Sequence, residues 1–121
     1  MKDAMEEAER MFQSALLSAA DLGSNYLVVS CLDGLAAAES KRDVDHASLV
    51  LGISDGLRSR VGVPRSSTER QIYEPYFASL REVSGAQSAE RVRAAAEAMT
   101  LRQVVAAALT PSRPAFRAGG S

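Results

Sequence analysis

The side chains most able to do covalent chemistry are scarce in this chain. His46 is the only histidine and Cys31 the only cysteine among 121 residues. Cys31 lies on an apolar stripe, where a free cysteine usually serves as a small, inert core residue. His46 stands at a predicted helix start without a plausible serine or cysteine partner nearby in sequence, so we interpret it as a surface or half-buried residue. Because no nucleophile and base are paired, we predict no catalytic residues and no enzymatic activity.

Acidic residues gather around one predicted helix junction. The group consists of Asp33, Glu39, Asp43 and Asp45. A calcium or magnesium site would need oxygen ligands at fixed positions of one loop, and this segment contains no such loop. We therefore expect the four carboxylates to cap helices and to face solvent, and we predict neither a metal site nor a cofactor.

Two further groups are suited to binding. The rings at 73, 76 and 77 share one helix face, which fits either core aromatics or a groove for a partner helix or peptide. Arginines at 58, 60, 65 and 70 bracket the central turn, which fits either a solvated turn or a site for an anion or an acidic partner. The residues that we select as partner-binding candidates are Tyr73, Tyr76, Phe77, Arg58, Arg65 and Arg70.

Composition predicts an all-α domain. Apolar residues make up 46% of the chain, aromatic residues only 5%, and tryptophan is absent. The abundant Ala, Leu, Glu and Arg are good helix formers, and alternating strand patterns are nearly absent. We expect one helical domain over residues 1–110 and a disordered tail over 111–121, which is mostly Pro, Gly, Ser, Ala and Arg.

Charge and targeting signals narrow the function further. The net charge is −1, which argues against direct binding of nucleic acid. The first 45 residues hold nine acidic and four basic residues, whereas the remainder holds six acidic and ten basic ones. The polar N-terminus is not a signal peptide, and no apolar run reaches the roughly 18 residues of a membrane span. We expect a cytoplasmic bacterial protein.

Apolar spacing and cap residues predict six helices. The expected ranges are 3–22, 25–41, 44–61, 67–84, a helix capped by Ser88, and 101–109. Gly23 ends the first helix, Ser24 or Asn25 begins the second, and Asp43 or Asp45 begins the third. Capping boxes are predicted where a hydroxyl residue precedes Glu or Gln by three positions, at Ser66 with Glu69 and at Thr100 with Gln103.

Three residues are unfavourable inside a helix, so their positions within the predicted helices need a structural explanation. Gly52 and Gly56 each cost about 1 kcal/mol relative to alanine, so we expect a neighbouring helix to approach closely there. Pro75 removes a backbone hydrogen bond, so we expect a kink or a restart of the fourth helix.

A weak internal repeat has a period of 39 residues. Residues 8, 11, 12, 15, 22 and 23 align with 47, 50, 51, 54, 61 and 62, with identities at the Ala and Gly pairs. A helix pair of this period is typical of solenoid proteins.

The order of segments resembles the tetratricopeptide-like repeat region of bacterial LuxR/MalT-type ATPase transcriptional regulators. The matching features are Leu51-Gly52, Gly62-Val63-Pro64, Glu69-Arg70 and Met99-Thr100-Leu101. The chain lacks a P-loop, and no recognition helix follows Pro111, so neither nucleotide chemistry nor DNA binding carries over. The resemblance implies stacked antiparallel helix pairs.

The resulting functional hypothesis is a non-enzymatic module for protein–protein interaction or effector sensing within, or left over from, a transcriptional regulator. A concave face of the first and third helices would receive the partner, which is another protein or another domain of the regulator. Exposed repeat ends favour a homodimer. The alternative hypothesis is a small-molecule-binding helical domain with Tyr73, Tyr76 and Phe77 around a pocket.

Overall fold

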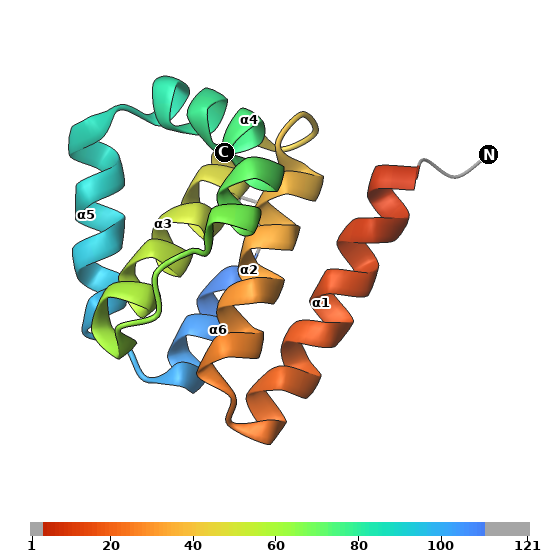
Figure 1. Ribbon diagram of the computed structural model, residues 1–121, viewed down its shortest axis with the longest axis vertical. Helices are drawn as coiled ribbons and strands as arrows, with labels where there is room; N and C mark the ends of the chain where they lie inside the picture. Colours follow the sequence, from red (N-terminus) through yellow and green to blue (C-terminus); the bar gives the residue numbers. More distant parts are fainter. Residues whose placement is uncertain (1–3, 111–121) are drawn as a thin grey trace, which may run out of the picture.

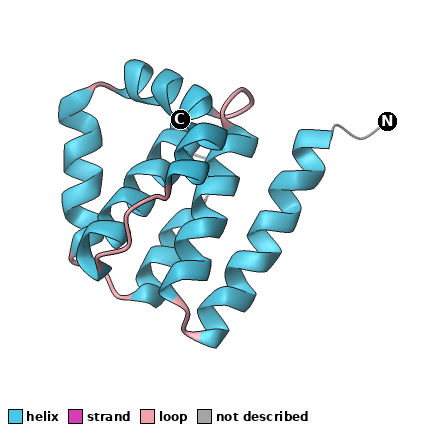
Figure 2. Cartoon of the chain, in the orientation of Figure 1, coloured by secondary structure: helices cyan, strands magenta, loops and turns pink. Residues whose placement is uncertain are grey.

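The computed structural model describes residues 4–110, and all of its regular structure is helical. The six helices are α1 (Ala4–Leu22), α2 (Asn25–Glu39), α3 (Val44–Val61), α4 (Ser67–Ser84), α5 (Ala86–Glu97) and α6 (Leu101–Leu109). Figure 2 shows helices and loops only over this range. The predictions of an all-α fold and of six helices are confirmed. The tail that we expect over 111–121 lies outside the described residues.

Four helices lie side by side in the order α1, α2, α3, α5 (Figure 1). Short turns at residues 23–24 and 40–43 make α1, α2 and α3 successively antiparallel. Helix α4 crosses in front of this layer, and α6 lies behind α2 and contacts α1, α2 and α3. Because α4 carries the chain back across the layer, α5 can pack beside α3 and run parallel to it.

Glycines allow α3 and α5 to pack closely. A Cβ atom on Gly52 would lie 2.7 Å from Cγ1 of Val92, and one on Gly56 would meet the Arg93 carbonyl and lie 2.6 Å from Cβ of Ala96. The earlier glycine in α3 meets the earlier residue in α5, and the later glycine meets the later ones. The two helices therefore run parallel. The close approach predicted for both glycines is confirmed.

Helix ends follow the predicted caps with two differences. Ser24 and Asp43 cap α2 and α3, and both predicted capping boxes form, at Ser66 and at Thr100. Ser88 does not cap α5: this helix begins at Ala86, and its N-cap residue Gly85 makes no side-chain bond. The positive φ of 82° at Gly85 ends α4, so one glycine separates the two helices. Helix α2 ends at Glu39, two residues earlier than predicted.

Pro75 does not make α4 restart. The helix continues from Ser67 to Ser84 with the proline inside it. The side of α4 that carries Phe77 and Leu80 is buried, with both residues 1% exposed. The continuous helix keeps these two side chains on one face towards the core.

The two halves of the internal repeat occupy different places. Helix α2 lies between α1 and α3 and separates the two halves of the repeat (Figure 1). Gly23 and Gly62 do adopt equivalent left-handed conformations, with φ of 68° and 70°. The repeat therefore predicts the matching ends of α1 and α3 correctly.

The described residues include no helix long and apolar enough to cross a membrane.

Candidate functional site

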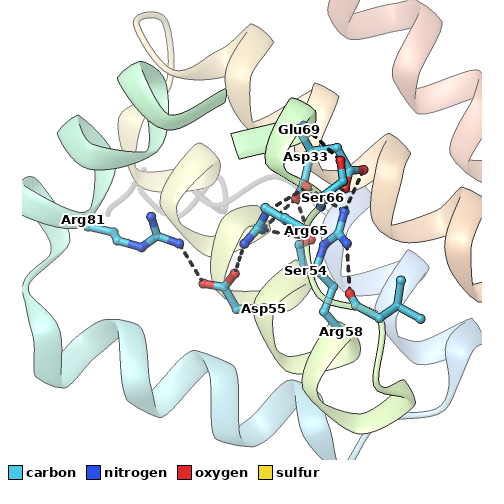
Figure 3. Close-up of polar contacts among 9 residues, drawn as sticks. Asp33, Ser54, Asp55, Arg58, Arg65, Ser66, Glu69 and Arg81 are labelled. Atoms are coloured by element: carbon cyan, nitrogen blue, oxygen red, sulfur yellow. Dashed lines mark hydrogen bonds and ion pairs between the residues drawn. The ribbon is translucent and has the colours of Figure 1, made fainter. Parts of the chain in front are cut away.

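The largest polar cluster is built around the carboxylate of Asp33, which is fully buried in the middle of α2 (Figure 3). The Ser54 hydroxyl donates to Oδ1 at 2.6 Å, and Nη2 of Arg58 donates to Oδ2 at 2.9 Å. Arg65 adds a bidentate pair from Nε and Nη2, each at 2.8 Å. Charge-assisted bonds of this kind are the strong ones, and together they satisfy a carboxylate that would otherwise be costly to bury.

The arginines of this cluster also hold the segment between α3 and α4. Nη1 of Arg58 donates to the Val63 carbonyl at 2.9 Å, and Nη1 of Arg65 donates to Asp55 at 2.7 Å. Burial lowers the pKa of Arg65, but Asp33 and Asp55 outweigh this effect and raise it. The cluster is therefore an ionic clamp between α2, α3 and the following loop.

The aromatic candidates cover one side of this clamp. The rings of Tyr73 and Phe77 stack with centroids 5.5 Å apart, and the guanidinium of Arg65 lies 4.9 Å from the Phe77 centroid. Burial and the nearby Asp33 raise the pKa of the Tyr73 hydroxyl, which therefore stays protonated. Phe77 is 1% exposed, and its ring contacts both Tyr73 and the Arg65 guanidinium. It therefore serves as a core residue.

The six predicted site residues therefore differ in role. Arg58, Arg65, Tyr73 and Phe77 meet at the clamp, and Tyr76 is half-buried against the core. Arg70 is exposed on the rim of an open depression of about 460 Å³, which Arg81 and Glu74 also line.

The charges of this depression are nearly balanced. Arg58 and Arg65 are bound to the buried Asp33, and Arg81 lies 3.4 Å from Asp55 and 3.9 Å from Glu74. The depression therefore offers little surplus positive charge, and its geometry does not favour an anion site.

A second buried polar cluster joins α1, α2 and α3. Nδ1 of His46 lies 2.6 Å from Oε1 of Glu39, and both residues are under 5% exposed. Glu9 of α1 interacts with Glu39 and accepts a bond from Nε of Arg42 at 3.1 Å. Burial lowers the pKa of His46, but Glu39, Asp43 and the Thr110 backbone outweigh it and raise the pKa.

The expectation that all four acidic residues face solvent is wrong for Asp33 and Glu39. They are 0% and 2% exposed and form the centres of the two clusters, whereas Asp43 caps α3 as predicted. A signal was present in the sequence. Asp33 and Glu39 are the only charged residues between Asn25 and Glu39, so each lies within an apolar helix. An acid in such a run needs an internal partner.

Cys31 and His46 are both unsuited to nucleophilic or acid–base catalysis. Burial raises the pKa of the Cys31 thiol, which lowers the fraction of reactive thiolate. His46 is 4% exposed and bound to Glu39, so its interpretation as a surface or half-buried residue is wrong. Residues 4–110 contain no group of three or more His, Cys, Asp or Glu residues that could hold a metal ion.

One face of α1 carries mostly small or apolar residues and is largely exposed. We call this face the α1 stripe, and its members are Ala4, Ala8, Met11, Ala15, Ser18 and Leu22. Met11 and Leu22 are 69% and 74% exposed, whereas Leu16 on the opposite side of the helix is fully buried. Helical spacing in the sequence groups six residues on one α1 face: Ala8, Met11, Phe12, Ala15, Ala19 and Leu22. In the structure Ala19 is buried and Phe12 packs against the core, whereas Met11, Ala15 and Leu22 are exposed.

Comparison with known proteins returns no match: no family model, no curated protein and no solved structure is similar to the chain.

Proposed function

We propose that this chain is a non-enzymatic helical module that binds another protein through the α1 stripe. The observation that carries the proposal is the contrast between two equivalent positions of the repeat. Val50 of α3 is fully buried, whereas Met11, its counterpart 39 residues earlier, is 69% exposed. Met11, Ala15 and Leu22 are all exposed on one face of α1, and apolar side chains gathered on one exposed face are typical of interaction sites.

The proposed role fits the resemblance to repeat regions of transcriptional regulators. In such a protein the module would connect the regulator to a partner or an effector-sensing domain in the cytoplasm. The clamp around Asp33 would keep the scaffold rigid, because its arginines are bound internally and not held ready for a partner.

The alternative of a small-molecule site among the rings is not favoured. Phe77 stacks on Tyr73, and Arg65 lies over the same ring, so the rings are packed against their neighbours.

Affinity purification from cells of the natural source tests the proposed surface. Met11→Glu places a charge on the α1 stripe, whereas Leu17→Glu places one on the side of α1 towards α6, at a residue that is 54% exposed. We expect Met11→Glu to lose the specific partner and Leu17→Glu to retain it. Equal recovery with both variants would refute an interaction through the stripe.

A further inference from the structure

We propose that Glu9, Glu39 and His46 form a proton-sensitive latch that holds the first two turns of α1 against α2 and α3. The latch is closed while the pair of His46 and Glu39 carries a proton, and it opens when that proton is lost. It acts within one chain and needs no partner on the α1 stripe.

The first turns of α1 are attached to the rest of the domain mainly through one charged residue. Over residues 4–11, Glu9 is the only buried side chain, whereas Leu16 anchors the second half of the helix in the core. Between these parts, the Phe12 ring lies against Gly34 of α2. Figure 1 shows that α1 diverges from α2 towards its N-terminal end. The attachment of the turns before Phe12 therefore depends on Glu9.

Glu9 is buried beside a second carboxyl group. The carboxyl groups of Glu9 and Glu39 are in hydrogen-bond contact, and they repel each other when both are ionised. Burial raises the pKa of Glu9, but the hydrogen bonds with Glu39 and Arg42 outweigh it and lower the pKa. Burial also raises the pKa of Glu39, and Glu9 adds to this rise against the opposing bond with His46. The two carboxyl groups therefore stay together only while nearby cations or a proton compensate them.

The compensation comes from one permanent and one removable cation. Nε and Nη2 of Arg42 donate to Oε1 of Glu9, the former at 3.1 Å, and the guanidinium keeps its charge at any ordinary pH. Nδ1 of His46 lies 2.6 Å from Oε1 of Glu39. With His46 protonated, two carboxylates face two cations. Once His46 is neutral, the two carboxylates share one guanidinium, and outward movement of Glu9 with the first turns of α1 relieves the repulsion.

The remaining groups around His46 favour its protonated form. Asp43 in the turn before α3 and the backbone of Thr110 after α6 both raise the pKa of His46, whereas Asp45 on the same turn of α3 is exposed. The folded pKa therefore lies above the ordinary value of 6.5. A group with a raised folded pKa contributes fully below its ordinary value and loses this contribution as the pH rises through the folded one. The latch is therefore closed in mild acid and opens on the alkaline side.

Carbon-13 NMR of the full chain tests the latch. The Cα shifts of residues 4–11 report helix content without depending on amide protons, so they can be followed at high pH. A detached segment of about two turns is too short to remain helical in water. Between about pH 6 and about pH 9, we expect these shifts to move from helical to coil values while those of α2 stay helical. The midpoint should coincide with the titration of the His46 ring in the same samples.

Three variants separate the latch from a general loss of stability. In Glu39→Gln the new amide can accept from His46 and donate to Glu9 but cannot ionise, so residues 4–11 should stay helical over the whole range. His46→Gln removes the cation, so the same residues should give coil shifts at both ends of the range. Glu7→Gln is the matched control, because that carboxylate lies on the same helix with its side chain 62% exposed, and it should follow the wild type.

The wild type and Glu39→Gln together decide the outcome even if His46→Gln does not fold. Wild-type shifts that stay helical throughout, or that move with a midpoint different from that of His46, overturn the inference. A transition that persists in Glu39→Gln, or that affects all six helices equally, overturns it as well.

Discussion

At the scale of single residues, two buried carboxylates organise the polar interior. Asp33 holds two arginines and a serine, and Glu39 holds His46. A charge taken out of water is stable only when its partners compensate for the lost hydration. Both acids are therefore structural residues, and their partners depend on them in turn.

Replacement of Asp33 should leave the guanidinium groups of buried Arg58 and half-buried Arg65 without their shared partner. We expect Asp33→Asn to lower the free energy of unfolding by about 3–5 kcal/mol, as is typical when one member of a buried ion pair is removed. Asp55→Asn is the matched control, because that side chain is 26% exposed and should cost about 1 kcal/mol or less. Urea unfolding followed by circular dichroism measures both. A similar loss in the two variants would contradict the central role of Asp33.

The pKa of His46 should be visible in the dependence of stability on pH. Its folded pKa lies above the ordinary value of 6.5, so the protonated ring binds its surroundings more favourably in the folded chain. This contribution is complete below pH 6.5 and is lost as the pH rises through the folded pKa. We expect stability to fall over this window and the fall to be absent in His46→Gln.

Proton NMR can measure the pKa of His46 directly, because the chain contains a single histidine. The folded protein should titrate above the same residue in urea. A folded pKa below the unfolded one would reverse the sign and refute the pairing with Glu39.

At the scale of elements, backbone proximity fixes how α3 meets α5. Gly52 faces a side chain, whereas Gly56 faces the backbone carbonyl of Arg93. A side chain can be shortened to make room, but a backbone carbonyl cannot, so the two glycines differ in how their replacement can be rescued.

Gly56→Ala should destabilise the domain even though alanine favours the helix by about 1 kcal/mol. Overpacking costs about 1–3 kcal/mol, and we expect a net loss because α5 must move away. Gly52→Ala should also destabilise, but Val92→Ala in the same chain should restore part of the loss. Thermal unfolding of the single and double variants measures these differences. A stabilised Gly56→Ala would show that α5 lies farther from α3.

At the scale of the whole molecule, the arrangement of helices gives α1 one buried and one uncovered side. Helix α1 is the edge of the layer, with α2 beside it and α6 behind (Figure 1). Helix α3 is central, so its equivalent apolar face is covered. The edge position makes the α1 stripe available to a partner.

Substitutions on the two sides of α1 should therefore have different costs. Leu16 is fully buried, so Leu16→Ala should cost about 2–5 kcal/mol. Met11→Glu should change the stability of the monomer by about 0.5 kcal/mol or less, as expected for a surface position. Dilute samples, in which the chain is monomeric, should be unfolded in urea. A large loss for Met11→Glu would place Met11 in the core and contradict the exposed stripe.

The sequence by itself determined the helices and most of their ends. Local rules suffice there, because the caps of Ser66 and Thr100 and the left-handed glycines act within a few residues. Ser88 was predicted as a cap from the same rules, but Gly85 ends α4 so close to Ala86 that the next helix has already begun. The close approach at Gly52 and Gly56 was also predictable, because glycine inside a helix needs such a reason.

Only the tertiary structure decided which faces are buried and which acids are paired. The 39-residue repeat gives Met11 and Val50 the same local pattern, yet one is exposed and the other buried, because α1 lies at the edge of the layer and α3 lies inside it. Asp33 and Arg65 lie 32 residues apart and meet only after α2, α3 and the following loop have packed. Burial and ion pairing depend on neighbours distant in sequence, so local spacing can indicate that an acid such as Asp33 needs a partner but not which residue that partner is.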